Sequence, residues 1–314
     1  MSVDDLAPVA LFAFNRPEHT RQTLEALAAN DLAPETRLTV FLDGSRDEED
    51  EKNRLRILSL LREETRFGSV NVVEREENFG LTRNIIGGVT QMLSLRDRVI
   101  VVEDDIITSP TFLRYMNNAL SRYESEYKVW HISGYTEPLN SNRSTDAYFS
   151  RVMNCWGWGT WKDKWQSFEK NPEKLVSEFT PEMIEDFNLN VNERFWSQVL
   201  ANVDGRLNTW AIFWYATIFK QGGLCLNPYV SFVRNIGFDG TGVHCGNDEI
   251  RSRETVLNTE SHIAFPDDVE ESRDGLHLLQ EYFRSRRKKP KKISKLSSLR
   301  KRLKKYVLGA FART

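Results

Sequence analysis

The sequence predicts an α/β fold, in which a mixed, mostly parallel sheet is flanked by helices. Short apolar runs alternate with segments of about 10 to 15 residues whose apolar side chains recur at helical spacing. One such run, Val99–Val102, consists only of β-branched residues, which is typical of a strand buried on both faces. This alternation implies βαβ units with right-handed crossovers, so the carboxyl ends of the parallel strands should meet at one edge.

Each expected element follows from its local pattern, and its ends fall at Pro, Gly, Asn or Asp. In the first half we expect strands at 8–14, 38–42, 70–74, 99–102 and 129–134, and helices at 18–30, 48–62, about 80–94 and about 111–127. In the second half we expect helices at 193–203 and 207–222 and strand-like segments at 224–226 and 230–233.

The composition, 40% apolar and 28% charged over 314 residues, is that of a globular protein. The three cysteines, Cys155, Cys225 and Cys245, are widely spaced and form neither a disulfide framework nor a paired zinc motif, which favours a reducing compartment. The N-terminus shows no basic and apolar signal-peptide pattern, and no run of about eighteen apolar residues predicts a membrane span. We therefore expect a cytoplasmic location.

Three consecutive acids, Glu103, Asp104 and Asp105, follow the buried run at 99–102. Three carboxylates side by side repel one another, so the arrangement is costly unless a cation or hydrogen-bond donors lie nearby. Mg²⁺ and Mn²⁺ prefer such oxygen ligands. Ligands of open α/β sheets bind outside the carboxyl ends of the strands, where these acids are expected. The alternative is an acidic turn that faces water.

Other polar loops should reach the same edge: Asn15-Arg16, Asp43-Gly44 and the segment 78–84. Together with the acids they predict a nucleotide pocket, although each alone is a common turn sequence. The chain contains neither G-x-G-x-x-G nor G-x-x-x-x-G-K-[ST], so a dinucleotide fold or a P-loop is not supported.

The segment 153–165 contains four Trp and two Gly in thirteen residues. Glycine lets a backbone approach a ligand closely, and indole rings bind the apolar faces of sugars while their N–H groups bind hydroxyls. The alternative is a core lid of aromatic side chains. Trp161 and Trp165, which are spaced i,i+4, are expected in the core.

Over roughly residues 7–246 the chain resembles a glycosyltransferase of the GT-A fold, in the bacterial family-two-like group related to the N-acetylglucosaminyltransferase I type. The resemblance depends on Phe14-Asn15-Arg16-Pro17, Leu42-Asp43-Gly44, Asn78-Phe79-Gly80-Leu81, Val101-Val102-Glu103-Asp104-Asp105, Trp156-Gly157-Trp158-Gly159 and Asn235-Ile236-Gly237 with His244. It implies a Rossmann-like GT-A domain at 1–265, with a nucleotide-binding half at 1–135 and an acceptor half at 136–265, and a C-terminal extension at 266–314.

The resemblance also implies a role for each motif. It implies a Mn²⁺ or Mg²⁺ ion on Asp105 and His244, and sugar contacts from Trp156, Gly157, Trp158 and Gly159. The residues that it assigns to the nucleotide are Asn15, Arg16, Asp43, Asn78, Gly80, Leu81, Arg83, Glu103 and Asp104.

One motif departs from the family. Relatives often carry Trp-Asp-x-x-Trp beside the acceptor, whereas this chain reads Trp210-Ala211-Ile212-Phe213-Trp214. An inverting transferase needs a carboxylate that takes the proton of the acceptor hydroxyl. By sequence, Asp204 and Asp239 are the nearest candidates for this catalytic base.

The resemblance thus implies a metal-dependent glycosyltransferase that uses a UDP-, GDP- or dTDP-sugar and a glycan or lipid-linked glycan, in cell-surface polysaccharide synthesis. One alternative is a nucleotidyltransferase acting on sugar phosphates, but this needs a Gly-rich triphosphate loop with Arg and Lys, and only Arg16 is present near the N-terminus. Another alternative is an inactive sugar-binding module, which Ala211 favours.

The C-terminal segment 284–314 has fourteen Lys or Arg and no acid, which leaves 29 basic and 45 acidic side chains in the rest of the chain. Apolar residues recur at helical spacing within it: Ile293, Leu296, Leu299, Leu303 and Val307. This pattern predicts a basic amphipathic helix on an anionic membrane surface, and hence peripheral attachment to the inner face of the cell membrane. The alternatives are nucleic acid, which we do not expect, and a solvated tail.

Overall fold

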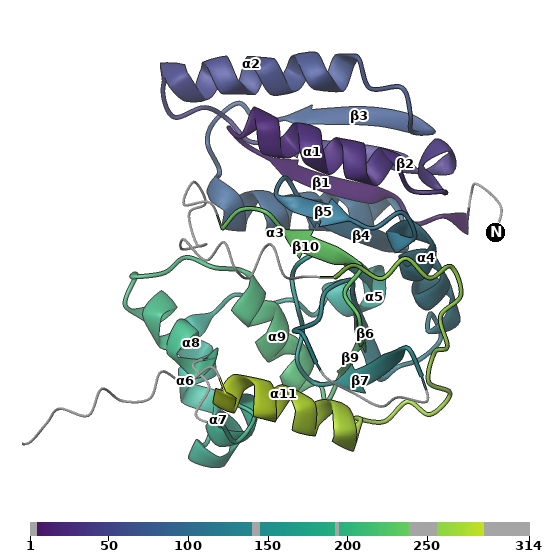
Figure 1. Ribbon diagram of the computed structural model, residues 1–314. Coiled ribbons are helices and arrows are strands. Elements are labelled where there is room, and N and C mark those ends of the chain that lie inside the picture. The colour runs from purple at the N-terminus through teal and green to yellow at the C-terminus, as the bar shows by residue number, and fades with distance from the viewer. Residues whose placement is uncertain (1–4, 140–144, 192–194, 239–255, 286–314) are drawn as a thin grey trace, which may run out of the picture.

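The computed structural model describes residues 5–139, 145–191, 195–238 and 256–285. An eight-stranded sheet runs through it in the order β3-β2-β1-β4-β8-β6-β9-β7 (Figure 1). The strands are β1 (Val9–Ala13), β2 (Arg37–Leu42), β3 (Ser69–Glu74), β4 (Arg98–Glu103), β6 (Val129–Ser133), β7 (Ala147–Ser150), β8 (Trp158–Trp161) and β9 (Leu224–Pro228). Within this sheet only β8 and β7 run against the other strands. The predicted mixed, mostly parallel sheet is confirmed.

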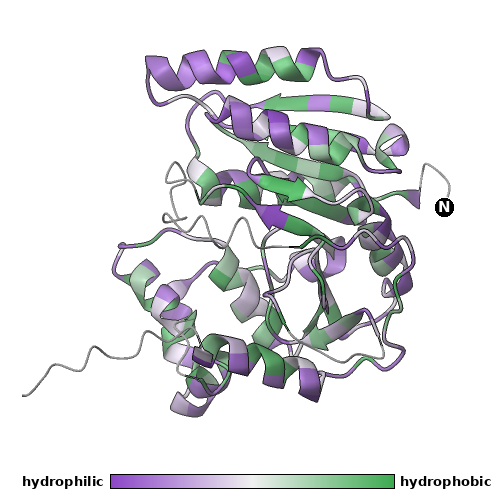
Figure 2. Cartoon of the chain, in the orientation of Figure 1, coloured by the Kyte–Doolittle hydropathy of each residue, from purple (hydrophilic) through white to green (hydrophobic). Residues whose placement is uncertain are grey.

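Helices cover both faces of the sheet (Figure 1). Apolar residues of α1, α2 and α4 pack on one face, and those of α3, α5, α8 and α9 pack on the other. Figure 2 shows hydrophobic residues concentrated in the strands and hydrophilic ones on the outer helices α1 and α2. The helices are α1 (Pro17–Ala28), η2 (Ala33–Glu35), α2 (Glu48–Arg62), α3 (Gly80–Leu95), α4 (Phe112–Arg122), α5 (Lys162–Trp165), α6 (Pro172–Glu178), α7 (Pro181–Phe187), α8 (Phe195–Val203), α9 (Ala211–Lys220) and α11 (Arg273–Ser285).

The register of the parallel strands brings their carboxyl ends to one level. Ala13 of β1 pairs with Leu42 of β2, and Phe12 pairs with Glu103 of β4. The loops that follow these strands therefore start beside one another. A second, two-stranded sheet continues from this edge, where β5 (Ile106–Thr108) pairs antiparallel with β10 (Val233–Asn235).

The Trp-Gly-Trp-Gly motif at 156–159, which we expected to contact a sugar, is partly built into the sheet. Its second half is β8, which lies between β4 and β6 in the middle of the sheet. Gly159 permits this position, because a Cβ there would lie only 3.0 Å from the Met116 side chain and 3.1 Å from the Val99 carbonyl oxygen. Trp161 and Trp165 are buried, as predicted.

Three of our expectations fall outside the described residues: Asp239, His244 and the basic helix within 286–314. Among the helices that the structure describes, none is long and apolar enough to cross a membrane.

Candidate functional site

The acidic triplet lies at the carboxyl end of β4, where the chain turns into β5. Asp104 and Asp105 are buried, and Glu103 is half-buried. Arg16, from the loop between β1 and α1, donates through Nη2 to Asp104 Oδ1 and, over 3.0 Å, to Asp105 Oδ2. Thr23 of α1 donates to the Asp104 carbonyl oxygen over 2.8 Å. The loop after β1 is thus tied to the loop after β4.

The charges of this cluster do not cancel. Burial, together with repulsion from the neighbouring aspartates, raises the pKa of Glu103. Burial also raises the pKa of Asp104, although Arg16 opposes this shift. Burial alone would lower the pKa of Arg16, but attraction to Asp104 and Asp105 outweighs it and the pKa lies above its ordinary value. A single guanidinium facing three carboxyl groups leaves a site that favours a further cation.

Two buried polar atoms of this cluster have no hydrogen-bond partner among the described residues: Oδ1 of Asp105 and Nη1 of Arg16. Buried polar atoms in folded proteins nearly always have a hydrogen-bond partner. Two neighbouring atoms without one, on groups of opposite charge, therefore call for an explanation. A cation on the carboxylate oxygen and an anionic oxygen on the guanidinium would satisfy both. A metal bound to a diphosphate supplies these two groups together.

The few carboxylates at this site suit a metal ion that takes most of its ligands from substrate and water rather than from the protein. In the described part of the chain no three His, Cys, Asp or Glu side chains are arranged around one metal position. Magnesium is commonly held by one or two carboxylates with substrate phosphates and water completing its shell. Asp105 fits that arrangement, because one of its oxygens is buried and has no partner in the part of the chain that the structure describes.

The segment after β10 covers Asp105. The Ile236 N–H donates to the Asp105 carbonyl oxygen over 2.9 Å, and the Gly237 N–H donates to Asn235 Oδ1 over 2.7 Å. A Cβ on Gly237 would lie 2.3 Å from Asp105 Oδ2, so only glycine fits without displacing the carboxylate. The chain then continues toward His244, outside the described residues.

Asp43, at the end of β2, holds the first turn of α3. Its Oδ1 accepts from the Gly44 and Phe79 N–H groups over 3.0 and 2.8 Å. Its Oδ2 accepts from the Gly80 N–H over 2.9 Å and from Asn78 Nδ2 over 3.3 Å. A carboxylate in this position satisfies donors at the start of a helix. Both oxygens of Asp43 are therefore already engaged within the protein.

Asn15 belongs to a second hydrogen-bond network at the same edge of the sheet. Its Nδ2 donates to Asp50 Oδ1 over 2.5 Å, and Arg46 Nε donates to Asp50 Oδ2 over 2.7 Å. The hydrogen bond from Arg46 lowers the pKa of Asp50 to about 2. The Arg46 guanidinium also lies 4.8 Å from the centre of the Phe14 ring. Sequence reasoning did not identify Arg46 or Asp50.

Leu81 and Arg83 lie on the first turn of α3, and both are exposed. Arg83 stacks on the Phe79 ring at 3.6 Å and forms a 2.9 Å ion pair with Glu77. Both side chains therefore lie at the surface beside this edge of the sheet and do not belong to the acidic cluster.

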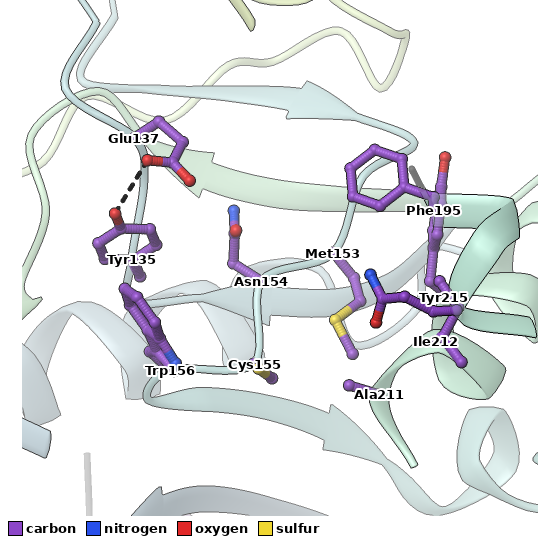
Figure 3. Close-up of a pocket in the computed structure, with 11 residues that line it drawn as sticks. Tyr135, Glu137, Met153, Asn154, Cys155, Trp156, Phe195, Ala211, Ile212 and Tyr215 are labelled. Carbon is purple, nitrogen blue, oxygen red and sulfur yellow. Dashed lines mark hydrogen bonds between the residues drawn. The ribbon is translucent and has the colours of Figure 1, made fainter. Parts of the chain in front are cut away.

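A cavity of about 200 Å³ opens beside this edge, between the carboxyl end of β6 and the helices α8 and α9 (Figure 3). It combines aromatic and aliphatic side chains with a carboxylate and two amides. Its lining residues are Tyr135, Glu137, Met153, Asn154, Cys155, Trp156, Phe195, Gln198, Ala211, Ile212 and Tyr215. Aromatic walls with a few polar groups are typical of sites that bind sugars and other small molecules.

The four residues of the Trp-Gly-Trp-Gly motif lie in different surroundings. Trp156 is half-buried and lines the cavity, and Gly157 follows it with a positive φ of 59°. Trp158 is fully buried and stacks on Trp210 at 5.2 Å. Gly159 lies in the middle of the sheet. Of the four, only Trp156 lines this cavity.

Trp156 also connects the cavity to the acidic cluster. Its ring contacts Tyr135 edge-on at 4.4 Å and Phe238 at 5.6 Å. Phe238 follows Gly237, the residue that lies against Asp105. The acidic cluster and the cavity are therefore adjacent parts of one site.

The carboxylate of the cavity is Glu137, which sequence reasoning missed. Asp204 is instead exposed, forms a 2.6 Å ion pair with Arg206 and does not line the cavity. Ala211 does line it, at the start of α9. The position of Glu137 just after an expected strand, at the same edge as Asp105, is the signal that could have identified it.

Comparisons with known proteins found solved structures with partial matches. No family model matches the chain, and no curated protein does. S. aureus TarS 1–349 with UDP-GlcNAc is 18% identical over 41% of this chain and 34% of that one, with a TM-score of 0.30. The mannosyltransferase PcManGT from Pyrobaculum calidifontis with GDP-Man and Mn²⁺ is 16% identical over 43% and 39%, also at 0.30. TarS 1–349 with UDP is 13% identical over 73% and 59%, at 0.39.

In each comparison the match spans less than two thirds of the solved structure. The three neighbours hold nucleotide sugars or a nucleotide. Because the identities are 13 to 18% and the TM-scores are 0.30 and 0.39, these structures do not assign a function to any residue of this chain.

Proposed function

We propose that this protein is a metal-dependent glycosyltransferase that moves a sugar from a nucleotide-sugar donor to a glycan or lipid-linked glycan acceptor. One observation carries the proposal: Arg16 and Asp105 form a largely buried ion pair at the carboxyl edge of the sheet, and each has a buried polar atom, of opposite charge, with no partner among the described residues. A divalent cation bound to a diphosphate satisfies both atoms. Such an ion stabilises the negative charge that develops on the leaving diphosphate.

The chain's own residues then bind and orient the donor. Asp105 would hold Mn²⁺ or Mg²⁺, with His244 as a second ligand, and Arg16 would bind a phosphate oxygen through Nη1. The edge around them would receive the nucleoside, and its residues are Asn15, Asp43, Asn78, Gly80, Leu81, Arg83, Glu103 and Asp104. Asp43 would act there by fixing the first turn of α3, since both its oxygens hold that turn.

The cavity would receive the sugar. Trp156 offers an aromatic face and Asn154 an amide, the two kinds of group that bind the C–H surface and the hydroxyls of a pyranose. Because Trp156 also contacts Phe238 beside Asp105, the sugar would lie next to the diphosphate. The two parts of the site thus match the two parts of a nucleotide sugar.

Donor binding tests this proposal directly. The full chain is titrated calorimetrically with UDP-, GDP- and dTDP-sugars, each with and without Mn²⁺. We expect one nucleotide class to bind, with Mn²⁺ strengthening binding at least about tenfold, and Asp105→Asn to abolish the Mn²⁺ effect. Asp163→Asn, an exposed acid on α5 outside the site, is the matched control. If no nucleotide sugar binds, or if Asp105→Asn responds to Mn²⁺ like the unmodified protein, the proposal is wrong.

We also propose that the basic segment 284–314 attaches the enzyme to anionic lipid, which suits a lipid-linked acceptor. The acidic remainder of the chain is repelled by such a surface, so this segment would carry the attachment. This places the enzyme at the inner face of the membrane, in the synthesis of cell-surface polysaccharide.

A further inference from the structure

Glu137 presents a carboxylate to the cavity from the edge that carries Asp105. It follows β6, which runs in the same direction as β4 because both strands pair antiparallel with β8. Glu137 is only 5% exposed, and its Oε2 accepts a hydrogen bond from the Tyr135 hydroxyl over 3.1 Å (Figure 3). Among the lining residues that the structure describes, it is the only carboxylate.

On the opposite wall, the residues that the structure describes offer no carboxylate. This wall is formed by α8 and α9, and Phe195, Ala211 and Ile212 lie there (Figure 3). Gln198 of α8 also lines the cavity. Tyr215 also belongs to α9, but its hydroxyl donates to the Phe187 carbonyl oxygen and burial raises its pKa. The methyl group of Ala211 cannot take a proton.

We propose that Glu137 is the general base of the transfer, an inference that rests on the proposed glycosyltransferase function. Its carboxylate takes the proton of the acceptor hydroxyl while the hydroxyl oxygen forms a bond to the anomeric carbon of the donor. The bond from that carbon to the diphosphate oxygen breaks, and its electron pair leaves with the nucleoside diphosphate. Displacement in a single step inverts the anomeric configuration.

Neighbouring residues fit this assignment. Tyr135 orients the carboxylate through its hydroxyl, and its ring packs edge-on against Trp156. Trp156 in turn contacts Phe238, which follows the glycine packed against Asp105. A sugar on Trp156 would therefore lie between a diphosphate at Asp105 and a hydroxyl at Glu137. In that position the base and the leaving group would lie on opposite sides of the anomeric carbon, as a direct displacement requires.

The test measures donor binding and turnover separately in the full-length protein. The donor is the nucleotide sugar that binds with Mn²⁺, and the acceptor is water, so turnover is donor hydrolysis. We expect Glu137→Gln to lower kcat by about a hundred- to ten-thousand-fold and to change the donor Kd by less than about twofold. Tyr135→Phe should lower kcat by a smaller factor. Glu178→Gln, the same change at an exposed surface ion pair on α6, should leave both quantities unchanged.

Several outcomes overturn the inference. Unchanged turnover in Glu137→Gln, or a sugar product that retains the donor's anomeric configuration by NMR, shows that Glu137 is not the base. If Glu137→Gln does not fold, Glu137→Asp is measured instead, because it keeps a carboxylate but withdraws it by one methylene. A reduced kcat at unchanged donor Kd then supports the inference, and an unchanged kcat refutes it. If the unmodified protein binds no nucleotide sugar, the proposed function fails and this inference fails with it. If the unmodified protein binds and hydrolyses the donor, and Glu137→Gln hydrolyses it at the same rate, only the assignment of Glu137 is refuted and the proposed function stands.

Discussion

Arg16 and Asp105 form a 3.0 Å ion pair that joins the loop after β1 to the loop after β4. The Arg16 side chain is 20% exposed and that of Asp105 only 8%. The same guanidinium nitrogen also binds Asp104. One arginine thus holds two buried carboxylates at the point where the sheet ends.

Arg16→Ala should destabilise the fold, because it leaves two buried carboxylates without their cation. Removing one partner of a buried pair costs on the order of 3 kcal/mol, and we expect a loss of that size in the free energy of urea unfolding. Mn²⁺ should recover part of this loss. The exposed pair of Asp204 and Arg206 provides the control, since Arg206→Ala should change the free energy by less than about 0.5 kcal/mol. Equal effects of the two variants would show that Arg16 has no special structural role.

Gly237→Ala should disturb the Asp105 carboxylate, which we propose as the metal ligand, without unfolding the protein. The new methyl group would lie 2.3 Å from Asp105 Oδ2, so the carboxylate or the segment that covers it has to move. We expect Mn²⁺-dependent donor binding to weaken at least about tenfold in calorimetry, with an unchanged circular dichroism spectrum.

Gly87→Ala is the matched control for this change. Gly87 is exposed on α3, and the nearest atom to an added Cβ is the end of the Arg75 side chain, 3.9 Å away. The alanine should stabilise the helix by roughly 0.5 to 1 kcal/mol and leave donor binding unchanged. Normal Mn²⁺-dependent binding in Gly237→Ala would contradict the placement of the metal on Asp105.

The parallel half of the sheet could be predicted because its signals are local. The β-branched run Val99–Val102 identifies a buried strand by itself, and the acids that follow it mark the strand's end. Asp43 was recognised as a strand-end residue for the same reason. That its oxygens hold the start of α3 could not be read from the sequence, because the Phe79 N–H belongs to a turn 36 residues further along the chain.

The middle of the sheet could not be predicted because it depends on distant partners. In the Trp-Gly-Trp-Gly motif the glycines suggested a close approach of the backbone to a ligand, yet Gly159 pairs with Ile100 of β4 and Ile132 of β6. Its lack of a side chain makes room for α4 rather than for a ligand. Glu137 was missed because its role depends on the cavity wall formed by α8 and α9, and no local pattern reveals that wall.

Deletion of residues 286–314 should abolish binding to anionic vesicles while it spares α11. Sedimentation with vesicles of phosphatidylglycerol and phosphatidylcholine should pellet the full chain and leave the truncated chain in the supernatant. Attachment should weaken with added salt, because screening reduces the attraction of Lys and Arg to the surface. Pure phosphatidylcholine vesicles are the control. Equal pelleting of both chains would refute attachment through this segment.

His131, in β6, should make the fold sensitive to acid. Its Nδ1 accepts from Trp214 Nε1 over 3.2 Å, and Nε2 lies 3.0 Å from the Asn154 carbonyl oxygen, so the neutral ring with the proton on Nε2 satisfies both contacts. Burial lowers the pKa of His131 to about 3, from 6.5 for an ordinary histidine. Between these values the unfolded chain binds a proton that the folded chain excludes, so stability falls as the pH falls from 6.5 toward 3.

The size of this effect sets the experiment. One pKa unit corresponds to about 1.4 kcal/mol, so His131 should contribute a loss of about 2 kcal/mol between pH 6.5 and 5. Urea unfolding of the unmodified protein and of His131→Gln across this range isolates the contribution, because the carboxyl groups that also titrate there are common to both. The slope with pH should be flatter in the variant, whereas His262→Gln, at an exposed position, should keep the original slope. Parallel slopes for the unmodified protein and His131→Gln would show that the ring takes up its proton in the folded state, and the contacts to Trp214 and Asn154 would then not exclude the charged form.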